Sequence, residues 1–199
     1  MAEVSAPDFS GDIIRLRRWL MFMALLTLLG AFTGVGYFVY GNVFGPVSDL
    51  VSVLLGFSLY PLVSEFYRIG PEAQTGIKLT EFIIGTVAVI LMIAGSAVLV
   101  LYGMGLDQLP AGIALGLQFT AIFFQGVWLI LVGIHLRNTG EFSAGTIRVG
   151  LVAGTGYILF GVSSPFGSDS PAASIGALIG LIAFVYWAFR IRKELSRTV

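Results

Sequence analysis

The chain has 199 residues, of which 57% are hydrophobic and only 11% are charged, and its formal net charge is zero. Soluble domains carry about 25% charged residues, so this composition excludes an ordinary soluble fold and predicts an integral membrane protein. The absence of cysteine excludes disulfides, thiol chemistry and iron–sulfur clusters built from this chain.

Six apolar segments are long enough to form helices that cross a bilayer, each of which needs about 20 residues. They cover residues 19–40, 50–67, 79–102, 112–136, 149–166 and 172–189. Their apolar runs are nearly continuous, whereas the strands of a membrane barrel alternate polar and apolar residues. The predicted fold is therefore all-α, a single transmembrane domain over residues 1–199 whose six helices form three successive helical hairpins.

The basic residues predict the orientation of these helices. All of them lie before the first span, between the second and third, between the fourth and fifth, or after the sixth: Arg15, Arg17, Arg18, Arg68, Lys78, Arg137, Arg148, Arg190, Arg192, Lys193 and Arg197. Because basic loops stay on the cytoplasmic side, we expect a plasma-membrane protein with both termini in the cytoplasm. These residues flank spans beside anionic lipid, so membrane lipid is an expected partner and nucleic acid is not.

Three positions along the chain predict local helix features. Asp12 is expected to cap a helix that begins at Ile13, and Ser170, followed by Pro171, to cap the last helix. Pro61 removes a backbone donor from the second span and predicts a kink there. We favour a structural kink over a functional hinge, because prolines are common in membrane helices.

Glycines four residues apart occur on the first, fourth, fifth and sixth spans. Such pairs let two helices approach closely, within one chain, in a homo-oligomer or against other membrane subunits, and the sequence does not separate these cases. The pairs are Gly30 with Gly34, Gly112 with Gly116, Gly150 with Gly154, and Gly176 with Gly180.

Two acids lie about one helical turn inside the predicted cytoplasmic boundary. Glu65 is three residues from Arg68, and Glu81 is three residues from Lys78. The favoured interpretation is an interfacial ion pair in each case, with side chains that reach water. The alternative is a proton- or cation-binding carboxylate at the inner mouth of a pathway, with the two glutamates facing each other. His135 is the only histidine, so no metal site or cofactor is expected.

Gln118 and Gln125 are the most interior strongly polar side chains, and their spacing puts them on one face of the fourth span. A buried amide without a partner costs several kcal/mol, so each should meet another helix, a water-filled cavity or a substrate. The candidate partners are hydroxyl residues of the neighbouring spans: Ser52, Ser58, Thr33, Thr86, Ser96 and Thr155. Hydrogen bonding between helices is favoured over a pathway for neutral polar solutes.

No motif in the sequence assigns a catalytic residue. The leading hypothesis is a non-enzymatic accessory or scaffold subunit, supported by the packing glycines and the absence of a charge in the middle of any span. A small channel or facilitator for ions or polar solutes is the alternative, and it requires Gln118 and Gln125 to face a cavity. A weaker alternative, an intramembrane enzyme acting on lipid, requires Glu65, Glu81 and His135 to share one cleft.

Overall fold

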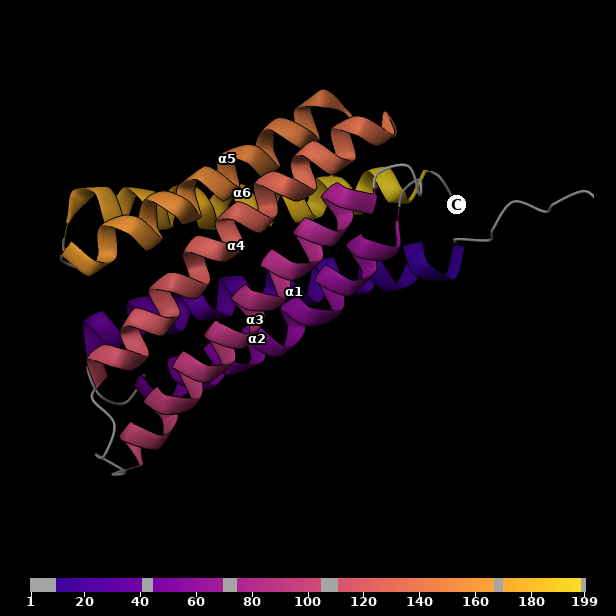
Figure 1. Cartoon of the computed structure of the whole chain (residues 1–199). Coiled ribbons are helices and arrows are strands. Elements are labelled where there is room, and N and C mark those ends of the chain that lie inside the picture. Colours follow the sequence, from indigo (N-terminus) through magenta and orange to yellow (C-terminus); the bar gives the residue numbers. More distant parts are fainter. Residues whose placement is uncertain (1–9, 41–44, 70–74, 105–110, 167–169, 198–199) are drawn as a thin grey trace, which may run out of the picture.

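The computed structural model describes residues 10–40, 45–69, 75–104, 111–166 and 170–197. In these ranges the chain is helical, without strands, and forms six long helices (Figure 1). They are α1 (Ser10–Tyr40), α2 (Gly45–Arg68), α3 (Thr75–Gly103), α4 (Ala111–Thr139), α5 (Ala144–Ser163) and α6 (Pro171–Leu195), and a short 3-10 turn, η3 (Ser164–Phe166), follows α5. Asp107 and Asp169, two acids in the loops that carry no basic residue, lie outside the described ranges.

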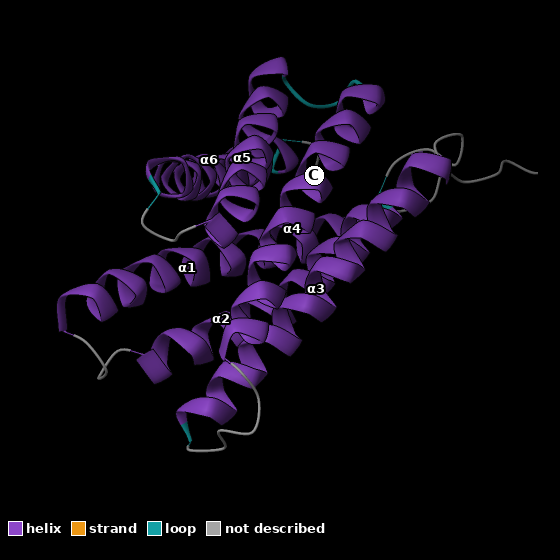
Figure 2. Cartoon of the chain, turned by 60° about the vertical axis from the view of Figure 1, so that its left-hand side comes forward, coloured by secondary structure: helices purple, strands orange, loops and turns teal. Residues whose placement is uncertain are grey.

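The helices follow one another around a closed ring. Each packs against its neighbours in the sequence, and α6 returns to pack against α1. In Figures 1 and 2, α5 and α6 lie on one side, α2 and α3 on the other, and α1 and α4 between them. We call the end where α1 begins and α6 ends the terminal end. Because successive helices run in opposite directions, the ring consists of helical hairpins, as the sequence predicts.

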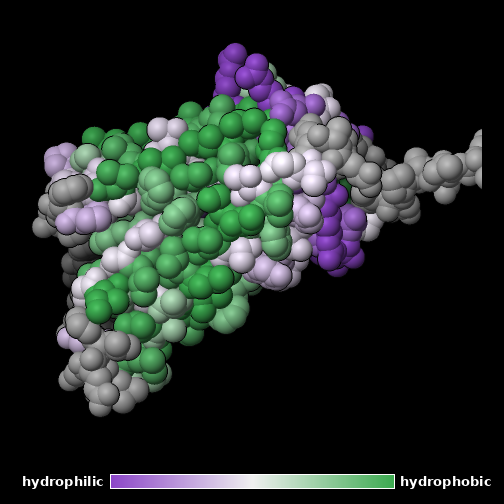
Figure 3. Space-filling model, in the orientation of Figure 1, coloured by the Kyte–Doolittle hydropathy of each residue, from purple (hydrophilic) through white to green (hydrophobic). Residues whose placement is uncertain are grey.

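Five helices are long and apolar enough to cross a membrane. The candidate spans are Val47–Arg68, Thr75–Gly103, Gly112–Thr139, Ala144–Ser163 and Pro171–Leu195. The predicted span over residues 19–40 lies in α1 and is not among these five, so the count of six stays a prediction. All the basic residues lie near the terminal end, and Figure 3 shows hydrophilic side chains gathered there beside a broad apolar band. This arrangement is consistent with a helical multi-pass membrane protein.

The helix ends agree with the sequence at one predicted cap and differ at the other. Ser170 caps α6 by accepting a hydrogen bond from the Ala173 amide at 3.1 Å, and Pro171 is the first helical residue. The prediction for Asp12 is wrong, because α1 begins at Ser10 and Asp12 lies in its first turn. There the carboxylate faces the positive end of the helix dipole and pairs with Arg15.

Pro61 lies inside α2, which continues to Arg68. The helix is therefore not broken at the proline, since neighbouring turns continue on both sides. The kink predicted at this position stays a prediction.

Aromatic side chains fill the middle of the ring toward the terminal end. Phe66 of α2 stacks on Trp187 of α6, with ring centroids 5.8 Å apart and planes inclined by 21°. The same Phe66 meets Trp128 of α4 edge-on at 5.9 Å. All three side chains are fully buried. Since α2, α4 and α6 are not neighbours in the ring, these contacts cross its centre and close it.

Glycines bring α4, α5 and α6 into backbone contact. A Cβ added to Gly154 would lie 2.7 Å from the Gly126 carbonyl oxygen, and one added to Gly176 would lie 2.6 Å from the backbone nitrogen of Phe160. Gly156 and Gly180 meet backbone to backbone in the same way. These helices therefore approach more closely than any larger residue would allow.

The other predicted packing glycines have varied surroundings. A Cβ on Gly150 would lie 2.6 Å from Nε1 of Trp187, and one on Gly30 would make ordinary contact with Leu55 at 3.4 Å. Gly112 and Gly116 have no atom of another helix within 4 Å of an added Cβ, so they pack against nothing in the described chain. The surroundings of Gly34 lie outside what the structure describes. Packing of Gly112 and Gly116 between subunits stays a prediction.

Candidate functional site

The half of the ring away from the terminal end contains a cavity of about 670 Å³ that is partly open to the outside, and all six helices contribute to its wall. This volume lies within the range of small-molecule sites, roughly 300–1,000 Å³. Its wall consists of Met23, Thr27, Gly30, Ala31, Ser52, Leu55, Met92, Ser96, Gln118, Ile122, Gln125, Tyr157, Phe160, Ser174, Ala177, Leu178 and Leu181.

Aromatic contacts close the cavity toward the terminal end. Tyr157 in the wall contacts Phe184, with centroids 6.2 Å apart, and Phe184 contacts Trp187 at 5.9 Å. Trp187 in turn stacks on Phe66 at the centre of the ring. Buried aromatic side chains thus lie between the cavity and the terminal end.

Three of the four predicted polar wall residues line this cavity, and one does not. Gln118, Gln125 and Ser52 lie on the wall. Ser58 is buried elsewhere and donates to the sulfur of Met23 at 2.7 Å. The seven-residue spacing on α4 thus places both amides toward the interior, as the helical period predicts.

The two glutamines differ in their hydrogen bonding. Gln118 donates from Nε2 to Oγ of Ser96 on α3 at 3.0 Å, which is the interhelical bond that the sequence favoured. Gln125 is only 6% exposed, yet its amide has no hydrogen-bond partner among the described residues. The hydroxyl of Tyr157, a residue 9% exposed, likewise has none there. Both groups lie on the cavity wall, so water or a ligand in the cavity is the partner open to them.

Among the described residues, the cavity wall carries no carboxylate and no basic side chain. Leu55, Ile122 and Leu181 supply apolar surface, and amides and hydroxyls lie between such residues. An ion would gain no compensating charge there and would lose its hydration. The wall suits an uncharged molecule with apolar surface and a few hydrogen-bonding groups.

A buried acid–base pair lies outside this cavity. Oε2 of Glu81 on α3 is 2.8 Å from Nδ1 of His135 on α4, and both residues are fully buried. Oε1 of Glu81 and Nε2 of His135 have no partner among the described residues. The prediction that Glu81 reaches water at the membrane interface is therefore wrong, because α4 covers it and supplies His135 as its partner.

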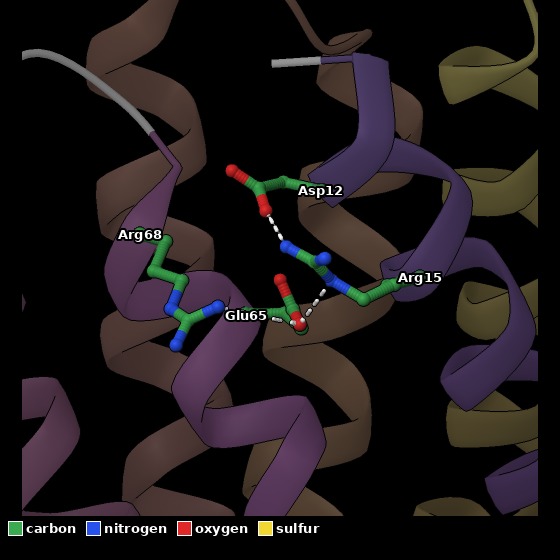
Figure 4. Close-up of polar contacts among 4 residues, drawn as sticks. All are labelled: Asp12, Arg15, Glu65 and Arg68. Carbon is green, nitrogen blue, oxygen red and sulfur yellow. Dashed lines mark hydrogen bonds and ion pairs between the residues drawn. The ribbon is translucent and has the colours of Figure 1, made fainter.

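Glu65 belongs to a separate cluster at the terminal end (Figure 4). Its Oε1 accepts a hydrogen bond from Nε of Arg15 at 3.1 Å and lies 4.0 Å from Nη1 of Arg68. Arg15 also pairs with Asp12. The pair with Arg68 was predicted, whereas the contact with Arg15 was missed. The sequence did contain a signal for this contact. Its charge pattern places the start of α1 and the end of α2 at the same membrane boundary, and therefore at a similar depth. The prediction that Glu65 reaches water is wrong, because the residue is only 5% exposed and its Oε2 is buried without a partner among the described residues.

The two glutamates have partners on different helices, since Glu65 contacts α1 and Glu81 contacts α4. No contact among the described residues pairs them with each other. None of Glu65, Glu81 and His135 lines the cavity or the two surface grooves found at α1 and at α5–α6. Among the described residues no three His, Asp or Glu side chains gather as metal ligands would. The intramembrane-enzyme alternative requires all three to share one cleft; Glu81 and His135 meet, and no contact in the described part of the chain joins Glu65 to them.

The fold and the cavity together describe a helical membrane protein with an interior, uncharged pocket. Comparison with models of protein families, with curated protein sequences and with solved structures finds no match to this chain.

Proposed function

We propose that this protein binds an uncharged, amphipathic small molecule in its central cavity, within the plasma membrane and with both termini in the cytoplasm. The observation that carries the proposal is Gln125, a residue only 6% exposed, whose amide lies on the cavity wall without a hydrogen-bond partner among the described residues. A protein gains nothing in stability from such a group, whereas a ligand that hydrogen-bonds to it gains affinity and specificity.

The position of the cavity supports entry from the half of the membrane opposite the terminal end. The aromatic contacts through Phe66 and Trp187 block the route to the terminal end. The described geometry therefore supports binding of a ligand in the cavity more directly than transfer of a solute across the membrane. Facilitated transfer, the second function expected from sequence, would additionally require these rings to separate.

The cavity shifts the preference away from the scaffold hypothesis. That hypothesis rested on packing glycines, and Gly154, Gly156, Gly176 and Gly180 contact other helices of the same chain. They are therefore not available to a partner. Assembly into a homo-oligomer or with other membrane subunits stays a prediction, without a role in this proposal.

Photoaffinity labelling in lipid nanodiscs tests the proposal. The probe is a neutral n-octanol that carries a diazirine, and mass spectrometry maps the labelled residues. We expect saturable labelling of wall residues such as Met23 and Met92, which excess unlabelled octanol prevents. Gln125→Leu should weaken labelling by roughly fivefold to tenfold, the value of one hydrogen bond of about 1–1.5 kcal/mol. Ala177→Phe, which fills part of the cavity, should abolish it.

A matched control and a stability measurement distinguish a binding role from a structural one. Thr120→Val changes an exposed residue on the same helix and should leave labelling unchanged. Gln125→Leu should not lower the thermal stability of the ligand-free protein, because it removes an unpaired buried amide. Labelling confined to lipid-facing residues, or insensitive to both cavity variants, would overturn the proposal.

A further inference from the structure

A groove of about 490 Å³ lies on the surface at the terminal end, where the start of α1 meets the end of α6. It is separate from the central cavity, and the two share no wall residue. The wall of the groove consists of Ile14, Arg17, Arg18, Met21, Phe22 and Leu25 from α1 and Arg192 from α6.

Three guanidinium groups share this groove, and no acid lies on its wall in the described part of the chain. Among the described residues, Arg17, Arg18 and Arg192 have no ion-pair partner. Arg15 and Arg68 of the terminal end differ in this respect, since both contact Glu65. Arg137, Arg148 and Arg197 have no ion-pair partner within the described ranges either, but they do not line a common groove with one another. Like charges that line one groove repel one another, so the groove concentrates positive charge that no acid among the described residues neutralises and that favours an anionic ligand.

An apolar strip leads away from the arginines along α1. Met21, Phe22 and Leu25 follow Arg17 and Arg18 by one to two helical turns, or about 5–12 Å along the axis. Phe22 and Leu25 are 46% and 55% exposed. In a membrane this strip faces acyl chains, and the arginines lie at the level of lipid headgroups.

We propose that this groove binds an anionic phospholipid. The headgroup phosphate is held by Arg17, Arg18 and Arg192, and an acyl chain lies along Phe22 and Leu25. Arginine suits this role because its planar guanidinium forms paired, charge-assisted hydrogen bonds with phosphate oxygens. Because the groove draws on both α1 and α6, a bound lipid bridges the contact that closes the helix ring.

Native mass spectrometry of the full chain in detergent, titrated with lipids of matched acyl chains, tests this proposal. We expect one phosphatidylglycerol to be retained at lipid concentrations at which phosphatidylcholine is lost. The triple variant R17Q/R18Q/R192Q should weaken phosphatidylglycerol binding by at least about tenfold, corresponding to 1.4 kcal/mol. R192Q alone should weaken it measurably, and it leaves the arginines that precede the first span intact.

The control variant R137Q/K193Q/R197Q removes the same charge from exposed positions outside the groove. It should retain phosphatidylglycerol as the unmodified protein does, and circular dichroism checks that each variant is folded. Equal retention of the two lipids, or equal loss in both triple variants, would overturn the proposal.

A competition experiment with glycerol 3-phosphate, a lipid headgroup without acyl chains, separates a lipid site from a site for a soluble anion. Competition by it at the lipid's own concentration would show a site for a soluble anion and would equally overturn the lipid assignment.

Discussion

Replacing one member of the Glu81–His135 pair should destabilise the protein far more than replacing both. The two side chains are fully buried and 2.8 Å apart, and each already has one polar atom without a described partner. His135→Leu leaves a buried carboxylate alone, which costs about 3–5 kcal/mol. Glu81→Leu leaves a histidine that is able to stay neutral, so the loss should be nearer 1–3 kcal/mol, the approximate cost of an unsatisfied polar group.

The double variant Glu81→Leu/His135→Leu removes both polar groups at once. Replacing a whole buried pair by apolar residues is often neutral, so its loss should stay within about 1 kcal/mol of the unmodified protein. Equilibrium unfolding in mixed micelles, followed by the fluorescence of the buried Trp128 and Trp187, measures all three variants. Together they form a double-mutant cycle, for which we expect a coupling energy of at least about 2 kcal/mol.

Thr80→Val is the control on the same helix, since Thr80 is exposed and bonds only to the Gly76 carbonyl of its own turn. It should change the free energy of unfolding by less than about 0.5 kcal/mol. The reasoning fails if the two single substitutions are additive and each costs less than about 1 kcal/mol, because the pair would then be solvated or energetically unimportant.

Two further predictions concern contacts between helices. Gly156→Ala should lower stability by about 1–3 kcal/mol, because the added methyl group meets the backbone of α6. The methyl group of Gly116→Ala meets nothing, so this control should be neutral. Thermal unfolding in detergent compares the two variants, and equal effects would contradict the packing argument. Glu194→Ala removes the acceptor of bonds from the amide and hydroxyl of Ser143, at 3.0 and 2.6 Å, and should cost about 1–2 kcal/mol. Amide hydrogen exchange should then rise at the start of α5 but not in the neighbouring Glu141→Ala variant, and unchanged exchange would refute the role of Glu194.

The helices and their order were predictable because they depend on local properties of the chain. Long apolar runs must form helices in a bilayer, where backbone groups have no other hydrogen-bond partners. Helix caps such as Ser170 depend on neighbouring residues only, and the alternation of basic and non-basic loops predicts that basic residues gather at one end. The seven-residue spacing of Gln118 and Gln125 also predicted that they share one face of the helix, and both residues line the cavity.

The partners of the polar residues were not predictable, because they come from distant parts of the chain. Glu81 was assigned to Lys78 by proximity in sequence, yet its hydrogen bond joins it to His135, 54 residues away. Arg15 and Glu65 are 50 residues apart and were likewise not paired in advance. The spacing along a helix gives the face of a residue but not the identity of the helix that covers this face.

The sequence by itself therefore determined an all-helical chain with its basic residues at one end, since apolar length and charge act residue by residue. Only the tertiary structure decided that the ring closes through α1 and α6, that aromatic side chains fill one half, and that the other half contains a partly open cavity. These features depend on how side chains from all six helices share one interior volume. The same packing leaves the Gln125 amide without a described partner while it gives Gln118 one, although the two residues look alike in the sequence.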